Sequence, residues 1–334
     1  MGRFNVEPLH CMIDLHLHLD GSLSPAIVRR LAELQQIAIP SEEREVKALL
    51  SVSEGCRDLN EYLEKFTFPC SLLQTEESIK EAFYLLSEEL RAQGLIYAEI
   101  RFAPQKHCEK GMTQEQVVQA AIAGLRRSTL KTALIVCCMR GNDTIDANRE
   151  TLRLAEEYYG RGVAALDLAG AEALFPTEDY GDLFAHAREK NIPYTIHAGE
   201  ADGSASVRAA LRFGTKRIGH GVRATEDETL VRELAEEGVT LEMCPTSNLN
   251  TAIVPKLADW PIRKLMDAGV KVTVNTDNMS VSATNLKAEY QKVVDTFGFS
   301  SEVVKQLLMN AAEASFAPES VKQELRETIE KSFR

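Results

Sequence analysis

The stretch CMIDLHLHLDGSLS, residues 11–24, decides the fold, because it contains the first predicted strand and the turn that follows it. A doubly wound open sheet would normally follow its first strand with a glycine-rich phosphate-binding turn of the form GxGxxG. This chain has HLDGSLS at that place. The turn therefore argues against the open sheet and leaves a closed arrangement of strands to be considered.

Seven more strand-like runs follow, and helical patterns separate them. The runs begin at Ile96, Thr132, Val163, Pro193, Arg217, Thr240 and Lys271. The clearest helical segment is SIKEAFYLLSEELRAQG, residues 78–94, which has apolar residues at three- and four-residue spacing and ends in glycine. Strands that alternate with helices pair in parallel, and eight such units close into a (β/α)8 or TIM barrel. We predict an α/β fold of this type, with extra helices after the first strand and at the C-terminus.

Composition bounds the domain organisation and the class of partner. We see no linker, internal repeat or low-complexity block, so we expect residues 1–334 to form a single barrel domain. The chain has 38 Lys and Arg against 50 Asp and Glu, a net charge of −12. This charge argues against nucleic acid or an anionic membrane surface as the main partner, since both attract basic patches. It suits an enzyme with a small-molecule substrate, and it leaves the oligomeric state open.

The cellular compartment is inferred from cysteines and apolar segments. No stretch approaches the roughly 18 consecutive apolar residues of a membrane span. The N-terminal residues MGRFNVEPLH lack an apolar signal core. The seven cysteines are an odd number and include no CxxC pair, which is typical of a reducing compartment. We therefore expect a cytoplasmic protein.

Four of the seven histidines lie at predicted strand ends, where barrels of this type build their active sites. His16 and His18 are two residues apart on one strand, so both project to the same face. An HxH pair alone often arises by chance, or forms a hydrogen-bonded pair in the core. His197 and Asp277 stand at two other strand ends, and together the four residues favour a metal site. Three imidazoles and one carboxylate suit Zn²⁺ with a position left open for water.

Three further roles follow from hydrolytic chemistry at such a metal. Zn²⁺ makes water a nucleophile at neutral pH, and proton transfers must accompany its attack. Asp277 could accept the water proton, and His220 at the sixth strand end could hold the nucleophile. Glu200, three residues after His197, could deliver a proton to the substrate as a general acid. In isolation Glu200 could equally be a solvated loop carboxylate.

At this point the chain resembles a known family. The motifs DLHLHLDGSLSP, DLAGAE, HAGE, RIGHG, TSN and VNTD occur in the order and at about the spacing found in the adenosine deaminases of the metal-dependent amidohydrolase superfamily. The resemblance covers about residues 8–330. It implies a (β/α)8 barrel with one Zn²⁺ per chain. It also implies hydrolysis of adenosine, and of 2′-deoxyadenosine, to inosine and ammonia in purine salvage.

The resemblance also assigns roles to individual residues. It makes the metal ligands His16, His18, His197 and Asp277. Glu200 would protonate N1 of the purine, and His220 would orient the attacking hydroxide. Gly170 would donate from its backbone to N3, where the missing side chain lets the backbone approach a ring. Asp20 would bind the ribose 5′-hydroxyl. The apolar lid over the base would be Leu59, Tyr62, Leu63 and Phe66, although each of these alone is more often a core residue.

Two departures from the family pattern bear on substrate range. Ala171 replaces an Asp, and Asn278 replaces the second Asp at the eighth strand. We expect Asn278 to donate to purine N7, because an amide donates at any pH. Asp20 favours a nucleoside, since deaminases of adenine tend to have Glu there and those of N6-methyl-AMP tend to have Asn. Deamination of adenine or of an N6-modified adenosine or AMP remains an alternative, as does a non-catalytic nucleoside-binding relative.

Other enzyme classes fit the sequence less well. The zinc deaminases that flip bases out of nucleic acid use HxE with PCxxC, and the chain has neither motif. A barrel phosphoesterase with several metals would need more histidine and carboxylate ligands than the strand ends supply.

Overall fold

The structure, a computed structural model, describes residues 4–53, 56 and 58–334. The eight strands in the described part of the chain lie where the sequence predicts them. They are β1 (Met12–His18), β2 (Leu95–Phe102), β3 (Lys131–Met139), β4 (Val163–Ala169), β5 (Thr195–Ala198), β6 (Arg217–His220), β7 (Thr240–Met243) and β8 (Lys271–Val274). Each pairs in parallel with the next, in two arcs of four, β1-β2-β3-β4 and β5-β6-β7-β8.

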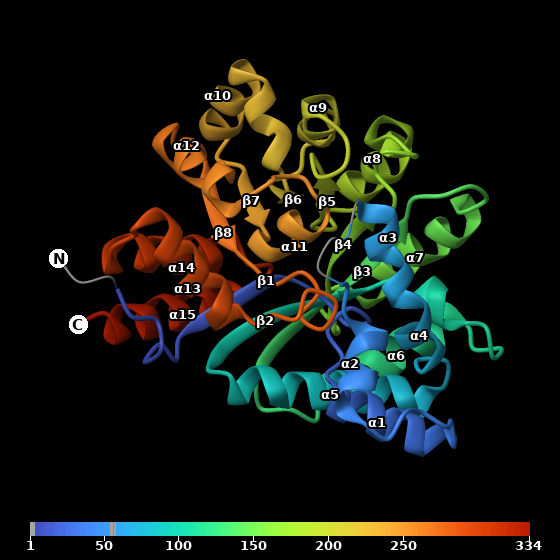
Figure 1. Ribbon diagram of the computed structural model, residues 1–334. Coiled ribbons are helices and arrows are strands. Elements are labelled where there is room, and N and C mark those ends of the chain that lie inside the picture. The colour runs from blue at the N-terminus through green and yellow to red at the C-terminus, as the bar shows by residue number, and fades with distance from the viewer. Residues whose placement is uncertain (1–3, 54–55, 57) are drawn as a thin grey trace.

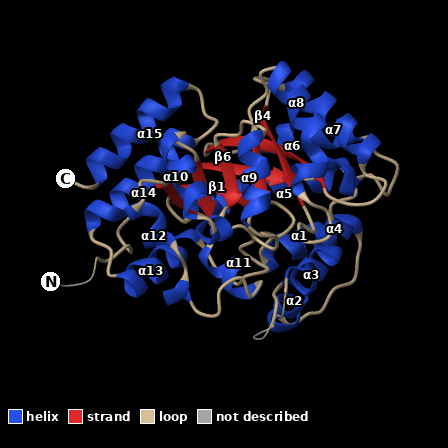
Figure 2. Cartoon of the chain, turned by 90° about the horizontal axis from the view of Figure 1, so that it is seen from above, coloured by secondary structure: helices blue, strands red, loops and turns tan. Residues whose placement is uncertain are grey.

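Backbone bonds join the two arcs into a ring. Leu166 of β4 bridges Tyr194 just before β5, and Leu17 of β1 bridges Asp277 just after β8. The second junction has the His18 amide donating to the Asp277 carbonyl at 2.8 Å and the Asp277 amide donating to the His16 carbonyl at 2.7 Å. The strands lie at the centre with helices around them (Figure 2). The predicted (β/α)8 barrel is confirmed.

Amphipathic helices cover the outside of the ring. They are α5 (Glu76–Ala92), α6 (Gln114–Leu125), α7 (Ile145–Tyr158), α8 (Gly181–Glu189), α9 (Ser204–Arg212), α10 (Glu228–Glu236) and α12 (Ile262–Asp267). In α5 the apolar stripe predicted from spacing is buried, and Thr75 and Ser78 form a capping box at its start. None of the helices described is long and apolar enough to cross a membrane.

The predicted extra helices occur in both expected places (Figure 1). After β1 the chain forms α1 (Pro25–Gln35), α2 (Glu43–Leu50), α3 (Leu59–Leu63) and α4 (Thr67–Ser71). At the C-terminus it forms α13 (Leu286–Phe297), α14 (Ser301–Ala314) and α15 (Glu319–Ser332). Helix α14 packs against β8 and β1, and α15 packs on α14, so the tail covers the junction that closes the ring.

One strand is shorter than the sequence predicts. The run TLEMCPTSN was expected to be extended throughout, but β7 ends at Met243 and a short helix, α11 (Pro245–Asn250), follows at once. Pro245 starts this helix because its fixed φ suits the first helical position and its missing N–H has no partner to lose there. The serine and asparagine of the TSN motif therefore lie on a helix.

The interior of the ring contains charged side chains. Arg101 of β2 and Arg217 of β6 lie among the carboxylates of Glu99, Asp167 and Glu242, and all five are at most 2% exposed. Arg101 bonds Asp167 at 3.0 Å and Glu242 at 2.7 Å, and Arg217 bonds Glu99 at 2.6 Å and Glu242 at 2.7 Å. Buried charges of this kind are tolerated only when they are paired and hydrogen-bonded. This network lies directly beneath the cluster of histidines described next.

Candidate active site

A cavity of about 540 Å³ opens at the carboxyl ends of the strands. It is lined by every residue that the sequence predicted for the site except His16, which is fully buried. The predicted residues in its wall are His18, Asp20, Leu59, Tyr62, Leu63, Phe66, Gly170, His197, Glu200, His220, Asp277 and Asn278. Residues that are far apart in the chain therefore meet at one place.

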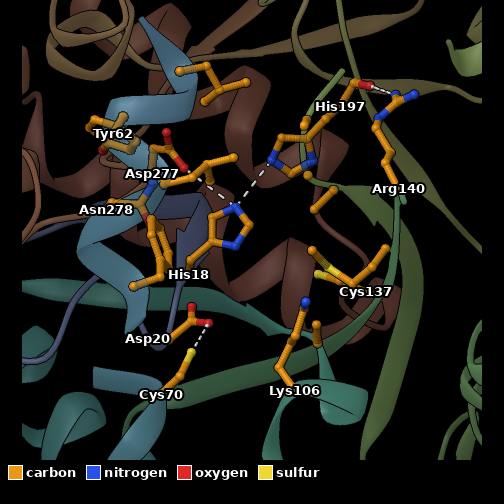
Figure 3. Close-up of a pocket in the computed structure, with 18 of the residues that line it drawn as sticks. His18, Asp20, Tyr62, Cys70, Lys106, Cys137, Arg140, His197, Asp277 and Asn278 are labelled. Atoms are coloured by element: carbon orange, nitrogen blue, oxygen red, sulfur yellow. Dashed lines mark hydrogen bonds and ion pairs between the residues drawn. The ribbon is translucent and has the colours of Figure 1, made fainter. Parts of the chain in front are cut away.

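Imidazoles and a carboxylate converge at the base of the cavity (Figure 3). One possible ligand atom from each of His16, His197, His220 and Asp277 lies within 4.8 Å of the others. His18 joins this group, since its Nε2 is 3.1 Å from Nε2 of His197 and 3.4 Å from Oδ1 of Asp277. Nε2 of His16 also lies 3.4 Å from Oδ1 of Asp277. Five side chains that could bind a metal ion thus lie together, namely the four predicted ligands and His220.

Carboxylates behind the histidines orient two of the rings. His16 Nδ1 is 2.9 Å from Glu242, and His197 Nδ1 is 3.0 Å from Asp167. Arg101 bonds both carboxylates, which keeps them ionised and therefore acceptors only. Each Nδ1 must then carry the proton, which leaves a lone pair on each Nε2; that of His197 is at the cavity wall, and that of His16 is beside Asp277. Sequence reasoning missed these positioning residues, although a charged residue inside an otherwise apolar strand was a signal.

Two site residues have strained backbones. His220 and Asp277 both have φ of 62°, in the left-handed region that side-chain-bearing residues seldom adopt. Such a conformation costs about 1–3 kcal/mol, and it persists where surrounding structure enforces it, often at functional sites. Each of these residues ends or follows a barrel strand, so the strain coincides with the strand ends that carry the cluster.

Glu200 is 5% exposed and stands beside this cluster. Burial, and then the negative charges of Asp277 and Glu172, raise the pKa of Glu200 well above its usual value. The protonated form of its carboxyl group is therefore favoured relative to that of an ordinary exposed glutamate. Its Oε2 lies 3.5 Å from Nε2 of His220. A buried carboxyl group with a raised pKa at the wall of a polar cavity has the property required of a general acid.

A second carboxylate holds the loop that carries Glu200. The side chain of Glu172, 1% exposed, accepts hydrogen bonds from four consecutive backbone amides, those of residues 199–202, at 2.6–3.1 Å. The Ser206 hydroxyl donates to the same carboxylate at 2.5 Å. Glu172 belongs to the DLAGAE motif, but the sequence alone gave it no role. The structure makes it the residue that fixes the loop after β5.

The opposite end of the cavity contains Asp20, with Cys70 donating to its carboxylate at 3.5 Å and Lys106 nearby (Figure 3). Burial raises the pKa of Asp20 to about 6. Over the cavity, Leu59 and Tyr62 of α3 form a small apolar cluster with Val281. The Tyr62 hydroxyl lies 2.7 Å from the Ser282 hydroxyl, so the predicted lid helix is tied to the loop that follows Asn278.

Comparison with known proteins gives the family. The sequence profile of the adenosine deaminase family matches residues 12–332. The chain belongs to the adenosine deaminase family. A relative named adenosine deaminase, from Haemophilus ducreyi, is 47% identical over 331 residues, which cover 96% of each chain. The identity extends over the whole barrel, so this family member is a hydrolase of the adenosine deaminase kind.

Solved structures of related deaminases have the same fold. An adenine deaminase from Arthrobacter aurescens is 27% identical, with a TM-score of 0.85 over 96% of this chain and 98% of the other. The N6-methyl-AMP deaminase of Arabidopsis thaliana is 25% identical, with a TM-score of 0.83 over 98% and 97% of the two chains. The adenosine deaminase fold thus serves several 6-aminopurines, and the residues of the cavity must distinguish among them.

Proposed function

We propose that this chain catalyses the hydrolytic deamination of adenosine, and of 2′-deoxyadenosine, to inosine and ammonia in purine salvage, with one Zn²⁺ bound per chain. The observation that carries the proposal is the buried Glu200 beside a converging group of imidazoles and one carboxylate in a single cavity. The identity of 47% to an adenosine deaminase along nearly the whole chain supports the substrate.

The residues present fit a zinc ion. His16 Nε2 is buried, it has no hydrogen-bond partner among the described residues, and it faces the shared Asp277 carboxylate. We assign the ligands as His16, His18, His197 and Asp277. Three imidazoles and a carboxylate are the ligand types that Zn²⁺ prefers, and thiol ligands are absent from the group. When bound, Zn²⁺ would supply a Lewis acid that makes water nucleophilic at neutral pH.

The protein's own groups then move protons and hold the substrate. Glu200 donates its proton to purine N1, which makes C6 more electrophilic. Asp277 accepts a proton from the water that attacks C6, and His220 orients that water. The oxygen of water forms a bond to C6, and the bond from C6 to the amino nitrogen breaks. The nitrogen leaves as ammonia with the one proton that Asp277 passes to it. The proton on N1 stays in inosine, and the hydroxyl proton at C6 returns to Glu200. Groups placed for such transfers each contribute about 10²- to 10⁴-fold.

The rest of the cavity would recognise the nucleoside. Gly170, with φ of 112°, presents its amide to N3, and Asp20 binds the ribose 5′-hydroxyl. Asn278 donates to N7. Leu59, Tyr62, Leu63 and Phe66 cover the base. A nucleotide is a poorer fit, because a 5′-phosphate beside the Asp20 carboxylate would meet like charge.

Deamination of adenine or of an N6-modified AMP is the second candidate, and the solved structures of such deaminases support it. The deciding experiment is an absorbance assay of the zinc-loaded protein with adenosine, 2′-deoxyadenosine, adenine, AMP and N6-methyl-AMP at matched concentrations. We expect loss of the adenine chromophore with the two nucleosides and much slower change with the others. Faster turnover of a base or nucleotide would reassign the substrate, and no turnover of any would favour a binding protein.

A further inference from the structure

Two uncharged side chains are hydrogen-bonded in series behind His220, whereas carboxylates stand behind His16 and His197. Trp260 Nε1 lies 3.1 Å from Oδ1 of Asn248, and Nδ2 of Asn248 lies 3.2 Å from Nδ1 of His220. Asn248 and His220 are fully buried, and Trp260 is 2% exposed. Asn248 lies within the short helix α11, where the sequence had suggested strand.

The chemistry of the three side chains determines which atom donates and which accepts in each of these two hydrogen bonds. An indole N–H can only donate, so the group of Asn248 that faces Trp260 must be its carbonyl oxygen. The amide nitrogen of Asn248 therefore faces His220, and it also can only donate. Nδ1 of His220 must then accept, which means that it has a lone pair and no proton. The single proton of this imidazole is on Nε2.

This arrangement is the reverse of the one behind the neighbouring rings. His16 and His197 donate from Nδ1 to the carboxylates of Glu242 and Asp167, so their Nε2 atoms are free to bind a cation. Nε2 of His220 is also buried and has no hydrogen-bond partner in the described part of the chain, but it carries a proton. A protonated ring nitrogen cannot bind a metal ion.

We propose that Asn248, held by Trp260, is a positioning residue that fixes His220 as a hydrogen-bond donor and excludes it from the metal ligands. His220 Nε2–H then points into the cavity toward the oxygen nucleophile, beside Glu200 Oε2 at 3.5 Å. The statement about the proton rests on the geometry of three side chains. Its consequence for catalysis rests on the proposed deamination.

The position of the proton can be measured directly in the zinc-loaded protein, labelled with ¹⁵N in its histidine rings. Two-bond ¹H–¹⁵N correlation spectra distinguish protonated from unprotonated ring nitrogens, and a His220→Gln sample identifies the His220 signals. We expect His220 to have an unprotonated Nδ1 and a protonated Nε2, with His16 and His197 showing a protonated Nδ1 in the same spectrum. A protonated Nδ1 in His220, or an Nε2 shifted by zinc, would overturn the proposal.

Two variants of Asn248 extend the test. In Asn248→Asp the carboxylate can only accept, so we expect the proton to appear on Nδ1 of His220. In Asn248→Leu the side chain has no donor or acceptor to fix the position of the proton on His220. We expect kcat for adenosine to fall about 10²-fold or more, because a misplaced imidazole proton typically costs about 10²- to 10⁴-fold in rate. The bound zinc and KM should change little. Unchanged kcat in Asn248→Leu would contradict the catalytic role.

Thr251→Val is the matched control. Thr251 is buried one turn away, where its hydroxyl donates to the Ser247 carbonyl at 2.9 Å, so the variant loses a buried hydrogen bond without altering the partner of His220. It should keep both the tautomer and kcat. The spectra are recorded without substrate. If the wild type failed to deaminate adenosine, the proposed function would fall while the tautomer result would still stand or fall by itself.

Discussion

Asn278 is held in place by a close contact with a glycine. A Cβ on Gly21 would lie 1.8 Å from Oδ1 of Asn278, so only glycine permits this approach. Oδ1 is buried and accepts no hydrogen bond from any described residue, while the side chain forms part of the cavity wall. The amide is therefore fixed against the chain that follows β1. A fixed amide at this position can form a hydrogen bond with one edge of a purine.

If Asn278 donates to N7, a substrate with carbon at that position, 7-deazaadenosine, leaves a buried donor unpaired. An unpaired donor costs about 1–3 kcal/mol, or roughly 5- to 150-fold in kcat/KM. Asn278→Leu should weaken adenosine turnover and reduce the preference over the deaza analogue. The measurement is the adenosine-to-deazaadenosine ratio of kcat/KM in both proteins. An unchanged ratio would show that Asn278 does not contact N7.

Glu200→Gln retains the shape of the side chain but removes the proton it would donate. We expect kcat to fall by about 10²- to 10⁴-fold, since that is the usual contribution of a general acid. Elemental analysis should find the same zinc content as in the wild type, because Glu200 is not among the proposed ligands. A variant with near wild-type kcat would require another group to protonate the purine.

At the scale of elements, hydrogen bonds to one carboxylate, that of Glu172, fix the conformation of the loop after β5. Glu172 accepts hydrogen bonds from four backbone amides of this loop, two of them in the buried part of the chain. Because the loop carries Glu200, the position of this proposed proton donor depends on Glu172, which lies 28 residues earlier in the chain. The stability of this element and the chemistry of the site are therefore coupled.

Glu172→Gln tests this coupling. The variant offers one acceptor oxygen, and its amide N–H groups face the backbone N–H groups of the loop. We expect the free energy of unfolding to fall by about 3 kcal/mol, since hydrogen bonds to a charged group contribute about 1.5–3 kcal/mol each. We also expect a lower kcat. Glu236→Gln, an exposed change on α10, is the control and should alter neither quantity. Equal stability of the two variants would refute the role of Glu172.

Local sequence patterns predicted the strands and helices well, but they did not predict the carboxylates that hydrogen-bond the site histidines. The eight strand positions follow from β-rich runs between amphipathic helices, and the strand ends bring His18, His197 and Asp277 together. The strand ending in TSN was extended too far, because the helix-starting effect of Pro245 outweighs the apolar run. Glu242 and Asp167 were missed because their partners, His16, His197 and Arg101, lie on other strands. A charge within an apolar strand indicates that some partner exists, but the local sequence does not say which residue it is.

In the whole molecule, the backbone hydrogen bonds that close the ring of strands also position residues of the candidate site. The bonds that join β8 to β1 run through the backbone of Asp277, next to His16 and His18. The C-terminal helices α13 and α14 pack against that junction, and α15 packs on α14 (Figure 1). The site is consequently sensitive to the stability of the entire barrel.

Acid should destabilise the barrel through His107. Burial lowers the pKa of His107 to about 3, whereas an unfolded histidine titrates near 6.5. Between these values the unfolded chain binds a proton that the folded chain does not, so the free energy of unfolding falls as pH is lowered. From pH 7 to pH 5 the wild type should lose about 2 kcal/mol more than His107→Leu.

Denaturant titrations at the two pH values measure this difference. His186→Gln serves as the control, because His186 is exposed on α8 and its substitution leaves the buried ring of His107 unchanged. If His107→Leu lost as much stability as the wild type between pH 7 and pH 5, His107 would not be the group responsible.

The central claim is that one Zn²⁺, held by His16, His18, His197 and Asp277, supports deamination of adenosine. Its most direct test is a titration of the metal-free protein with Zn²⁺, with inosine formation measured at each addition. We predict that activity rises in proportion to added zinc and reaches its plateau at one equivalent per chain. Full activity in the metal-free protein, or a plateau only at two equivalents, would contradict the claim.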